Sequence, residues 1–375
     1  MQILKSKYVF DGSKILTDTA IVYENKKVIA VIAVKDIAVL YGNEHEIIDF
    51  GDGVITRGFT DLQVNGIGGV AFNHAPTIDT LETMYKTNLK FGTLRFLPTM
   101  ITCDFSNIIQ ALNTVKNWFL QYGNSRGVLG LHLEGPFLSP QKPGIHPKEY
   151  IIKPTHEYLE QIVNFRKYFP IKLTIAVEEF TKEQIEYLID NQIILAIGHS
   201  NASYSVTKDG YDFGIKAITH TFNAMSGLSA RNPGVIAAAL NLPFYCGLIA
   251  DLIHVESANI ELLYKLKKDL IYLVSDSVTP TGTDISEFNF LGHALFVKGG
   301  KVVNNNGVLG GAYLTLNQAV KNCISAGIPL FDALKMAIVT PLLVMGFDTN
   351  YASIIEGSEA NLVYLNLTTF NCKII

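Results

Sequence analysis

The sequence predicts an α/β fold, a (β/α)8 barrel of the TIM type with a small β-sandwich domain formed by both chain ends. Strand-like apolar runs alternate with helix-length amphipathic segments from residue 54 onward, which is typical of βα units around a parallel sheet. Eight such runs can be counted, as a closed barrel requires. Both chain ends are rich in short β segments and flank the barrel region, so we expect them to pair with each other.

The elements follow one another in this order. Short β segments, "QILKSKYVF", "TAIVYEN" and "KKVIAVIAV", open the chain and are separated by Asp-Gly and Glu-Asn turns. We assign residues 1–53 and 355–375 to the sandwich domain and residues 54–354 to the catalytic barrel. Barrel strands are expected at 54–63, 93–100, 127–135, 171–178, 192–200, 216–222, 245–251 and 271–276. Two β runs around a Gly-Gly turn, helices near 313–326 and 330–344, and a final β segment complete the chain.

Composition excludes several classes of function. The chain has 375 residues, of which 48% are hydrophobic and 17% charged, so it can bury a large core. A formal net charge of -4 gives no reason to expect nucleic acid or a membrane as partner. Scattered cysteines without CxxC spacing, and an N-terminus unlike a secretory leader, favour a cytoplasmic protein. The longest apolar run, residues 28–34, is far shorter than the roughly 20 residues that cross a bilayer.

Four residues that can bind a metal or move a proton stand at the ends of predicted strands. Glu134 ends the third strand, His199 the fifth, His220 the sixth and Asp276 the eighth. In a barrel these ends meet at one mouth, where the loops build the active site. One Glu and two His leave a position open for water, as a catalytic metal requires. We therefore predict the Glu and both His as ligands of a divalent ion, and Asp276 as general base and acid.

Each of these residues also has a purely structural alternative. Asp276 could cap the segment that follows it, His199 could be a hydrogen-bonded loop histidine, and Glu134 could be a turn acid paired with an arginine. Their combination at four separate strand ends favours a shared ligand. His132 lies on the same face of its strand as Glu134, and we expect it to pack inside the barrel or to contact a metal ligand rather than the metal itself. His74 has no assigned role.

Six motifs follow one another along the chain: "GFTDLQVNGIGG", "LGLHLEGPFLSPQKPGIHP", "GHSNASY", "THTFNAMSGLSARNPG", "YCGLIADLIHV" and "LVSDSVTPTG". In this order they resemble the N-acetylglucosamine-6-phosphate deacetylases of the amidohydrolase superfamily. The resemblance implies hydrolysis of N-acetyl-D-glucosamine 6-phosphate to D-glucosamine 6-phosphate and acetate, in amino-sugar catabolism. It also implies the metal ligands and the proton-transferring residue named above.

The same resemblance implies a set of contacts to a phosphorylated amino sugar. His146 should lie beside the acetamide carbonyl, with Ile145 next to it, while Asn223 and Ala224 should meet the phosphate. The sugar should be lined by Leu309, Gly310, Gly311 and Ala312.

Two further contacts concern the phosphate and a second subunit. His254 should contact the sugar or the phosphate. Arg231 is expected to reach the phosphate in the neighbouring active site of a homodimer, a role that suits a planar guanidinium.

The first barrel strand departs from the pattern of many amidohydrolases. Where those often carry His-x-His for a second metal, this chain has Gln63, Val64 and Asn65. Amides are poor zinc ligands beside imidazoles, so we predict one ion per chain, zinc or iron(II). Gln63 and Asn65 are expected to hydrogen-bond a water or the substrate instead.

Two other functions stay open at this point. An amidohydrolase acting on another N-acetylated sugar or on a cyclic amide would share the fold and the metal site. A substrate without phosphate would have no use for Asn223, Arg231 and His254. The other alternative is a non-catalytic, amidohydrolase-like scaffold, but such proteins lack the ligands that are present here.

Overall fold

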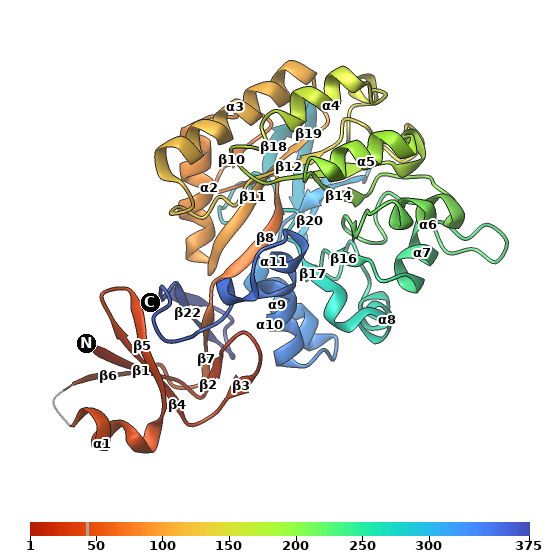
Figure 1. Cartoon of the computed structure of the whole chain (residues 1–375). Coiled ribbons are helices and arrows are strands. Elements are labelled where there is room, and N and C mark those ends of the chain that lie inside the picture. Colours follow the sequence, from red (N-terminus) through yellow and green to blue (C-terminus); the bar gives the residue numbers. More distant parts are fainter. Residues whose placement is uncertain (43–44) are drawn as a thin grey trace.

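The computed structural model describes residues 1–42 and 45–375. Figure 1 shows a barrel with helices around it and, beside it, a smaller β domain that holds both chain termini. Within the described residues, no helix combines the length and the apolar character needed to cross a membrane.

Eight parallel strands form the barrel, and their order in the sheet follows their order in the chain. The parallel bridge between Val64 and Ser277 joins the end of the first strand to the segment after the last one. Each of the eight predicted strands has a counterpart in this sheet, although the first begins later than predicted, and the predicted fold class is confirmed. The strands are β8 (Phe59–Val64), β11 (Thr93–Ile101), β12 (Leu131–Glu134), β13 (Ile171–Ile175), β14 (Ile194–Ile197), β15 (Ala217–Ile218), β16 (Tyr245–Leu248) and β17 (Ile271–Leu273).

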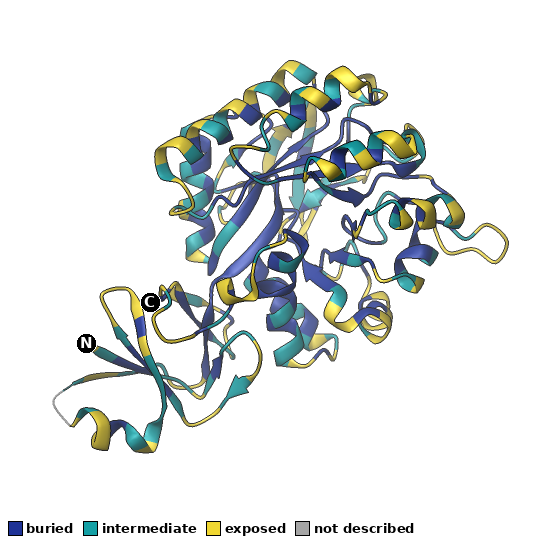
Figure 2. Cartoon of the chain, in the orientation of Figure 1, coloured by how far each residue is buried: buried dark blue, intermediate teal, exposed yellow. Residues whose placement is uncertain are grey.

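Helices surround the barrel, with their buried faces against the sheet and their exposed faces outward (Figure 2). Local signals mark their starts: Thr77 caps the first helix of the barrel, and Thr181 and Gln184 form a capping box on a later one. The predicted helix 330–344 is two helices, because Pro341 has no N–H to donate and its ring clashes with the preceding turn. The helices are α2 (Ile78–Lys90), α3 (Phe105–Tyr122), α4 (His156–Val163), α5 (Lys182–Asp190), α6 (Tyr204–Asp212), α7 (Val235–Asn241), α8 (Ser257–Lys267), α9 (Leu316–Ser325), α10 (Leu330–Ile338) and α11 (Thr340–Val344).

The small domain is a sandwich of two sheets, ordered β5-β4-β1-β6 and β23-β22-β7-β2-β3. Leu4, Ile21, Ile55 and Leu362 are among the residues that form its core. A short helix, α1 (Ile37–Tyr41), packs on the outer face of the first sheet through Ile37. The strands are β1 (Gln2–Lys5), β2 (Tyr8–Phe10), β3 (Ile15–Leu16), β4 (Thr19–Glu24), β5 (Lys27–Ala33), β6 (Glu46–Asp49), β7 (Gly53–Arg57), β22 (Leu362–Asn366) and β23 (Cys372–Ile374).

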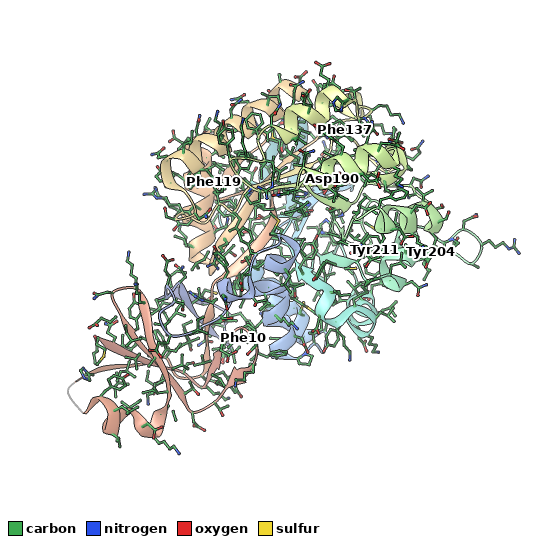
Figure 3. The ribbon with its side chains drawn as sticks, viewed as in Figure 1. Phe10, Phe119, Phe137, Asp190, Tyr204 and Tyr211 are labelled. Carbon is green, nitrogen blue, oxygen red and sulfur yellow. The ribbon has the colours of Figure 1, made fainter. Side chains whose placement is uncertain are left out.

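The predicted strand 54–63 is in fact two strands, β7 in the sandwich and β8 in the barrel. Gly58 separates them, and a Cβ there would lie 2.5 Å from a side-chain carbon of Leu94. The domain division at 53/54 stays a prediction, and the pairing of β7 with β22 favours a division nearer Gly58. Phe10 of β2, which is labelled in Figure 3, packs against Phe331 of α10 with ring centroids 5.8 Å apart. This contact joins the two parts.

An antiparallel sheet of four strands follows β17 and lies at the mouth of the barrel. The sequence predicted only its central hairpin around Gly299 and Gly300. Phe290 and Leu295 of this sheet pack with Ile101 of β11, so the sheet forms one wall above the strand ends. Its strands are β18 (Glu287–Phe290), β19 (His293–Lys298), β20 (Lys301–Asn304) and β21 (Leu309–Ala312), and two short strands, β9 (Gly66–Ile67) and β10 (Val70–Ala71), follow β8.

Candidate active site

A cavity of about 340 Å³ opens at the C-terminal ends of the barrel strands, and all four strand-end residues line it. Glu134 is the last residue of β12, while His199, His220 and Asp276 follow β14, β15 and β17. These last three have backbone φ angles of 48°, 28° and 50°, a left-handed region that residues with a Cβ seldom adopt. Such conformations cluster at functional sites, where the surrounding structure holds them in place.

The carboxylate of Glu134 and two imidazoles form a tight triangle. Glu134 Oε1 lies 2.8 Å from His220 Nε2 and 3.2 Å from His199 Nε2, and the two Nε2 atoms are 3.1 Å apart. All three side chains are buried. In a tetrahedral zinc site with bonds of about 2.1 Å, two ligand atoms lie roughly 3.4 Å apart. The triangle is close to that spacing.

A hydrogen bond to the backbone sets the tautomer of His199. His199 Nδ1 lies 2.9 Å from the carbonyl oxygen of Lys142, which can only accept, so Nδ1 carries the proton in the neutral ring. His199 Nε2 then turns a lone pair toward the carboxylate of Glu134, an arrangement that needs a cation between them. A metal-binding histidine commonly donates its other N–H to a carbonyl in this way. The residues therefore fit a divalent metal ion.

Charge is balanced differently when no metal is bound. Burial disfavours the carboxylate of Glu134, yet the adjacent imidazoles of His199 and His220 hold its pKa well below the usual range. Burial also disfavours the imidazolium of His220, but the hydrogen bond and the charge of Glu134 raise its pKa. The two shifts favour a proton on His220 beside the Glu134 carboxylate when no metal is bound, and metal binding would release that proton.

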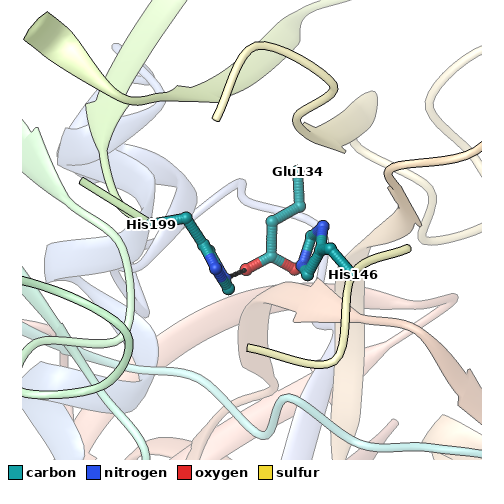
Figure 4. A group of neighbouring side chains, drawn as sticks. All are labelled: Glu134, His146 and His199. Atoms are coloured by element: carbon teal, nitrogen blue, oxygen red, sulfur yellow. Dashed lines mark hydrogen bonds and ion pairs between the residues drawn. The ribbon is translucent and has the colours of Figure 1, made fainter. Parts of the chain in front are cut away.

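His146 forms a second candidate ligand group with Glu134 and His199, shown in Figure 4. One ligand atom each of Glu134, His146 and His199 lie within 4.8 Å of one another, which is looser than the triangle that includes His220. His146 Nδ1 is 2.8 Å from Thr102 Oγ1, and its ring centroid is 4.3 Å from that of His199. Burial and the neighbouring His199 hold the pKa of His146 well below the usual range, so its ring is neutral. We retain the tighter triangle as the candidate metal site.

Asp276 is held by the two amides of the first strand. Its Oδ1 accepts from Gln63 Nε2 at 3.0 Å and from Asn65 Nδ2 at 2.7 Å. Gln63 Nε2 also donates to Glu134 Oε2 at 3.1 Å, so this amide links the acid to the metal triangle. Burial and the nearby charge of Glu134 raise the pKa of Asp276 to about 6. A carboxyl group with this pKa can take up and return a proton near neutral pH.

The other residues predicted to bind substrate are divided between the cavity and its surroundings. Gly310 and Ala312 alternate with cavity residues along β21 and are not in the lining, and Gln63 lies behind Asp276. Arg231 is exposed on the segment that leads into α7, which projects from the body of the barrel in Figure 1. Those that line the cavity are Asn65, Ile145, His146, Asn223, Ala224, His254, Leu309 and Gly311.

Sequence reasoning missed several residues that shape the site. Asp251 accepts from His254 Nδ1 at 2.7 Å and orients that ring, and its position at the end of the seventh predicted strand was a signal that could have revealed it. Lys142 acts through its backbone carbonyl, which no side-chain pattern reveals. The apolar wall is built from Ile101, Ile249, Val278, Phe290 and Val308.

A polar layer lies inside the barrel beneath the site. His132 Nε2 is 2.8 Å from Thr174 Oγ1 and 3.3 Å from Lys172 Nζ, and its Nδ1 is 3.2 Å from Thr99 Oγ1. His132 does not line the cavity. His74 is exposed and does not line it either.

Comparisons with known proteins agree with this geometry. The model of the amidohydrolase family matches residues 54–375. The N-acetylglucosamine-6-phosphate deacetylase of Haemophilus influenzae is 37% identical over 319 residues, which cover 84% of this chain and 83% of that protein. The N-acetylgalactosamine-6-phosphate deacetylase of a Shewanella species is 34% identical over 318 residues, 84% of this chain and 79% of that protein.

Solved structures agree as well. The N-acetylglucosamine-6-phosphate deacetylase of Pasteurella multocida superposes with a TM-score of 0.93 at 36% identity, covering 99% of this chain and 96% of that one. These comparisons confirm the resemblance that the motifs indicated. The chain is therefore a hydrolase that belongs to the amidohydrolase family.

Proposed function

We propose that this chain is a metal-dependent deacetylase that hydrolyses N-acetyl-D-glucosamine 6-phosphate to D-glucosamine 6-phosphate and acetate. The observation that carries the proposal is the triangle of Glu134, His199 and His220 with Asp276 beside it in one cavity. A non-catalytic scaffold would have no need to bury these groups together, because burying unpaired polar groups is costly. The similarity to deacetylases of amino-sugar phosphates supports the substrate class.

Glu134, His199 and His220 would hold one divalent ion, zinc or iron(II). Such an ion supplies Lewis acidity toward the acetamide carbonyl and lowers the pKa of water. Gln63 and Asn65 would be poor ligands for a second ion, because neutral amides lack the charge and basicity of carboxylates and imidazoles. Their N–H groups point instead to the carboxylates of Asp276 and Glu134. The first barrel strand therefore orients the acid–base group in place of a second metal site.

Asp276 would move the proton during hydrolysis. In its ionised form it accepts a proton from the attacking water, and it then delivers that proton to the sugar nitrogen as the C–N bond breaks. Two amide donors keep its carboxylate aimed into the cavity. The neutral His146 would donate a hydrogen bond to the acetamide carbonyl from the far side of the triangle.

The phosphate would be bound at the other end of the cavity. Asn223 and Ala224 line it on the segment after His220, and His254 lines it with its ring oriented by Asp251. We further propose a homodimer in which Arg231 of one subunit reaches the phosphate bound by the other. Its exposed position on a projecting segment is consistent with this role. The expected cytoplasmic location stays a prediction.

A second candidate substrate is N-acetyl-D-galactosamine 6-phosphate, which differs in the configuration at C4. The 34% identical Shewanella relative favours it over unphosphorylated or cyclic amides. Both sugars would use the same metal triangle and the same acid–base group.

Acetate release from purified, metal-loaded protein tests the proposal. We expect one equivalent each of acetate and free amine from N-acetylglucosamine 6-phosphate, with a lower kcat/KM for the galactosamine isomer. A higher kcat/KM for the isomer would favour the second candidate. No acetate from either sugar phosphate would refute the proposed function.

A further inference from the structure

Glu178 is a half-buried residue that does not line the cavity. It lies in a short 3-10 turn, Val177–Glu179, directly after β13. Its Oε2 accepts from Ser200 Oγ at 2.6 Å, and its Oε1 accepts from the backbone N–H of Asn201 at 2.5 Å. Hydrogen bonds to a carboxylate at these distances are strong ones. Both therefore fasten the turn that carries His199.

His199 needs such support. Its φ of 48° lies in the left-handed region, which is unfavourable for a residue with a Cβ and persists only when the surroundings hold it. Two other loops hydrogen-bond to the backbone here. The N–H of Ser139 donates to the carbonyl oxygen of His199 at 2.9 Å, and the N–H of Ser226 donates to the carbonyl oxygen of Ser200 at 3.0 Å. Glu178 supplies the only side-chain carboxylate in contact with Ser200 and Asn201 within the described residues.

We propose that Glu178 is a positioning residue for the metal site, which sets the backbone of residues 199–201 so that His199 Nε2 faces Glu134 and His220. The inference rests on the proposed function only in taking His199 as a ligand. The alternative is a purely structural role, in which Glu178 only stabilises a surface turn. The two differ in what the variant loses: a structural residue affects unfolding, whereas a positioning residue affects metal affinity in the folded chain.

Glu178→Gln is the direct test because glutamine keeps the size but has only one acceptor oxygen for two donors. We expect its dissociation constant for zinc, measured by competition with a chromophoric chelator, to rise about 10- to 100-fold, as for other groups that orient metal ligands. Turnover at limiting zinc should fall in parallel and recover with excess zinc. Circular dichroism and thermal unfolding of the metal-free protein would establish that the variant is folded.

Glu179→Gln is the matched control, since the neighbouring Glu179 pairs with Lys153 and, within the described residues, makes no hydrogen bond or ion pair with the 199–201 turn. Its zinc affinity should equal that of the wild type. Ser200→Ala removes the hydrogen bond that Ser200 donates to Glu178 and should weaken zinc binding to a smaller extent. This second variant tests the inference if Glu178→Gln does not fold. Wild-type zinc affinity in folded Glu178→Gln, or in Ser200→Ala where only that variant folds, would overturn the inference. A wild-type protein that binds no zinc would instead refute the proposed metal site, and this inference with it.

Discussion

Replacing Asp276 with asparagine removes the proposed acid–base group while keeping its shape. Asp276 Oδ1 accepts from Gln63 Nε2 and Asn65 Nδ2 at 3.0 and 2.7 Å, and the carbonyl oxygen of an asparagine can take over both bonds. The remaining atom becomes an NH2 group, which cannot accept a proton from water. Loss of positioned acid–base catalysis costs about 10²–10⁴ in rate. We therefore expect kcat for Asp276→Asn to fall by that factor.

The wild-type pH profile carries the same information. Asp276 must be ionised to act as a base, and its pKa is raised to about 6, by burial first and then by the charge of Glu134. As the pH falls through 6 the carboxylate is protonated, so kcat/KM should decline there and approach its plateau above pH 7. The residual activity of Asp276→Asn should lack this decline.

The assay is acetate release at saturating sugar phosphate, with metal content and substrate binding measured on the same preparations. Asp276→Asn should retain one metal ion and should bind substrate by calorimetry, because the triangle and the cavity remain. A variant that turns over near the wild-type rate with its metal in place would refute the assignment. Loss of the metal from this variant would instead indicate a structural role for Asp276.

Four further predictions concern the metal, the phosphate, the second subunit and packing. Glu134→Gln should lose the metal and the activity together, because an amide cannot supply the charge that the triangle needs; full metal content by elemental analysis would argue against this ligand set. Removing the 6-phosphate should lower kcat/KM far more than removing a sugar hydroxyl, since charge-assisted hydrogen bonds contribute roughly 1.5–3 kcal/mol each. Comparable kcat/KM values for N-acetylglucosamine and its 6-phosphate would contradict the phosphate pocket. If Arg231 acts across a dimer, mixing Arg231→Ala with Asp276→Asn should regain activity through heterodimers, and an inactive mixture of proven heterodimers would exclude that role. Gly311→Ala should destabilise the chain by about 1–3 kcal/mol in denaturant unfolding, because φ is 75° and a Cβ would lie 2.4 Å from Val278 Cγ1; an unchanged midpoint would contradict this packing.

The barrel was predictable because apolar strand-length runs alternate with helix-length segments, and four of those runs end at a residue that can bind a metal or move a proton. Strand ends converge in a barrel, so Glu134, His199, His220 and Asp276 could be grouped from the order of the residues alone. The point at which the first apolar run leaves one sheet and enters the other could not be predicted. Gly58 divides one apolar run between two domains, and nothing in the alternation of that run reveals the division.

Contacts made through the backbone, or between side chains distant in sequence, escaped prediction for a different reason. The carbonyl of Lys142 fixes the tautomer of His199, yet any residue type has a carbonyl. Glu178 reads in the sequence as an ordinary acid after a strand, and only the fold brings it against Ser200 and Asn201. Gln63 was expected to meet water or substrate, whereas it bridges two carboxylates of the site.

Titration of the metal-free protein with zinc, followed by acetate release from N-acetylglucosamine 6-phosphate, tests the central claim most directly. We expect no turnover without metal, a linear rise in turnover up to one equivalent of zinc per chain, and no further gain beyond it. Proton release should accompany binding, because the proton that His220 takes up beside Glu134 must leave. Full activity in rigorously metal-free protein, or a rise that continues to two equivalents, would contradict a site built from Glu134, His199 and His220 alone.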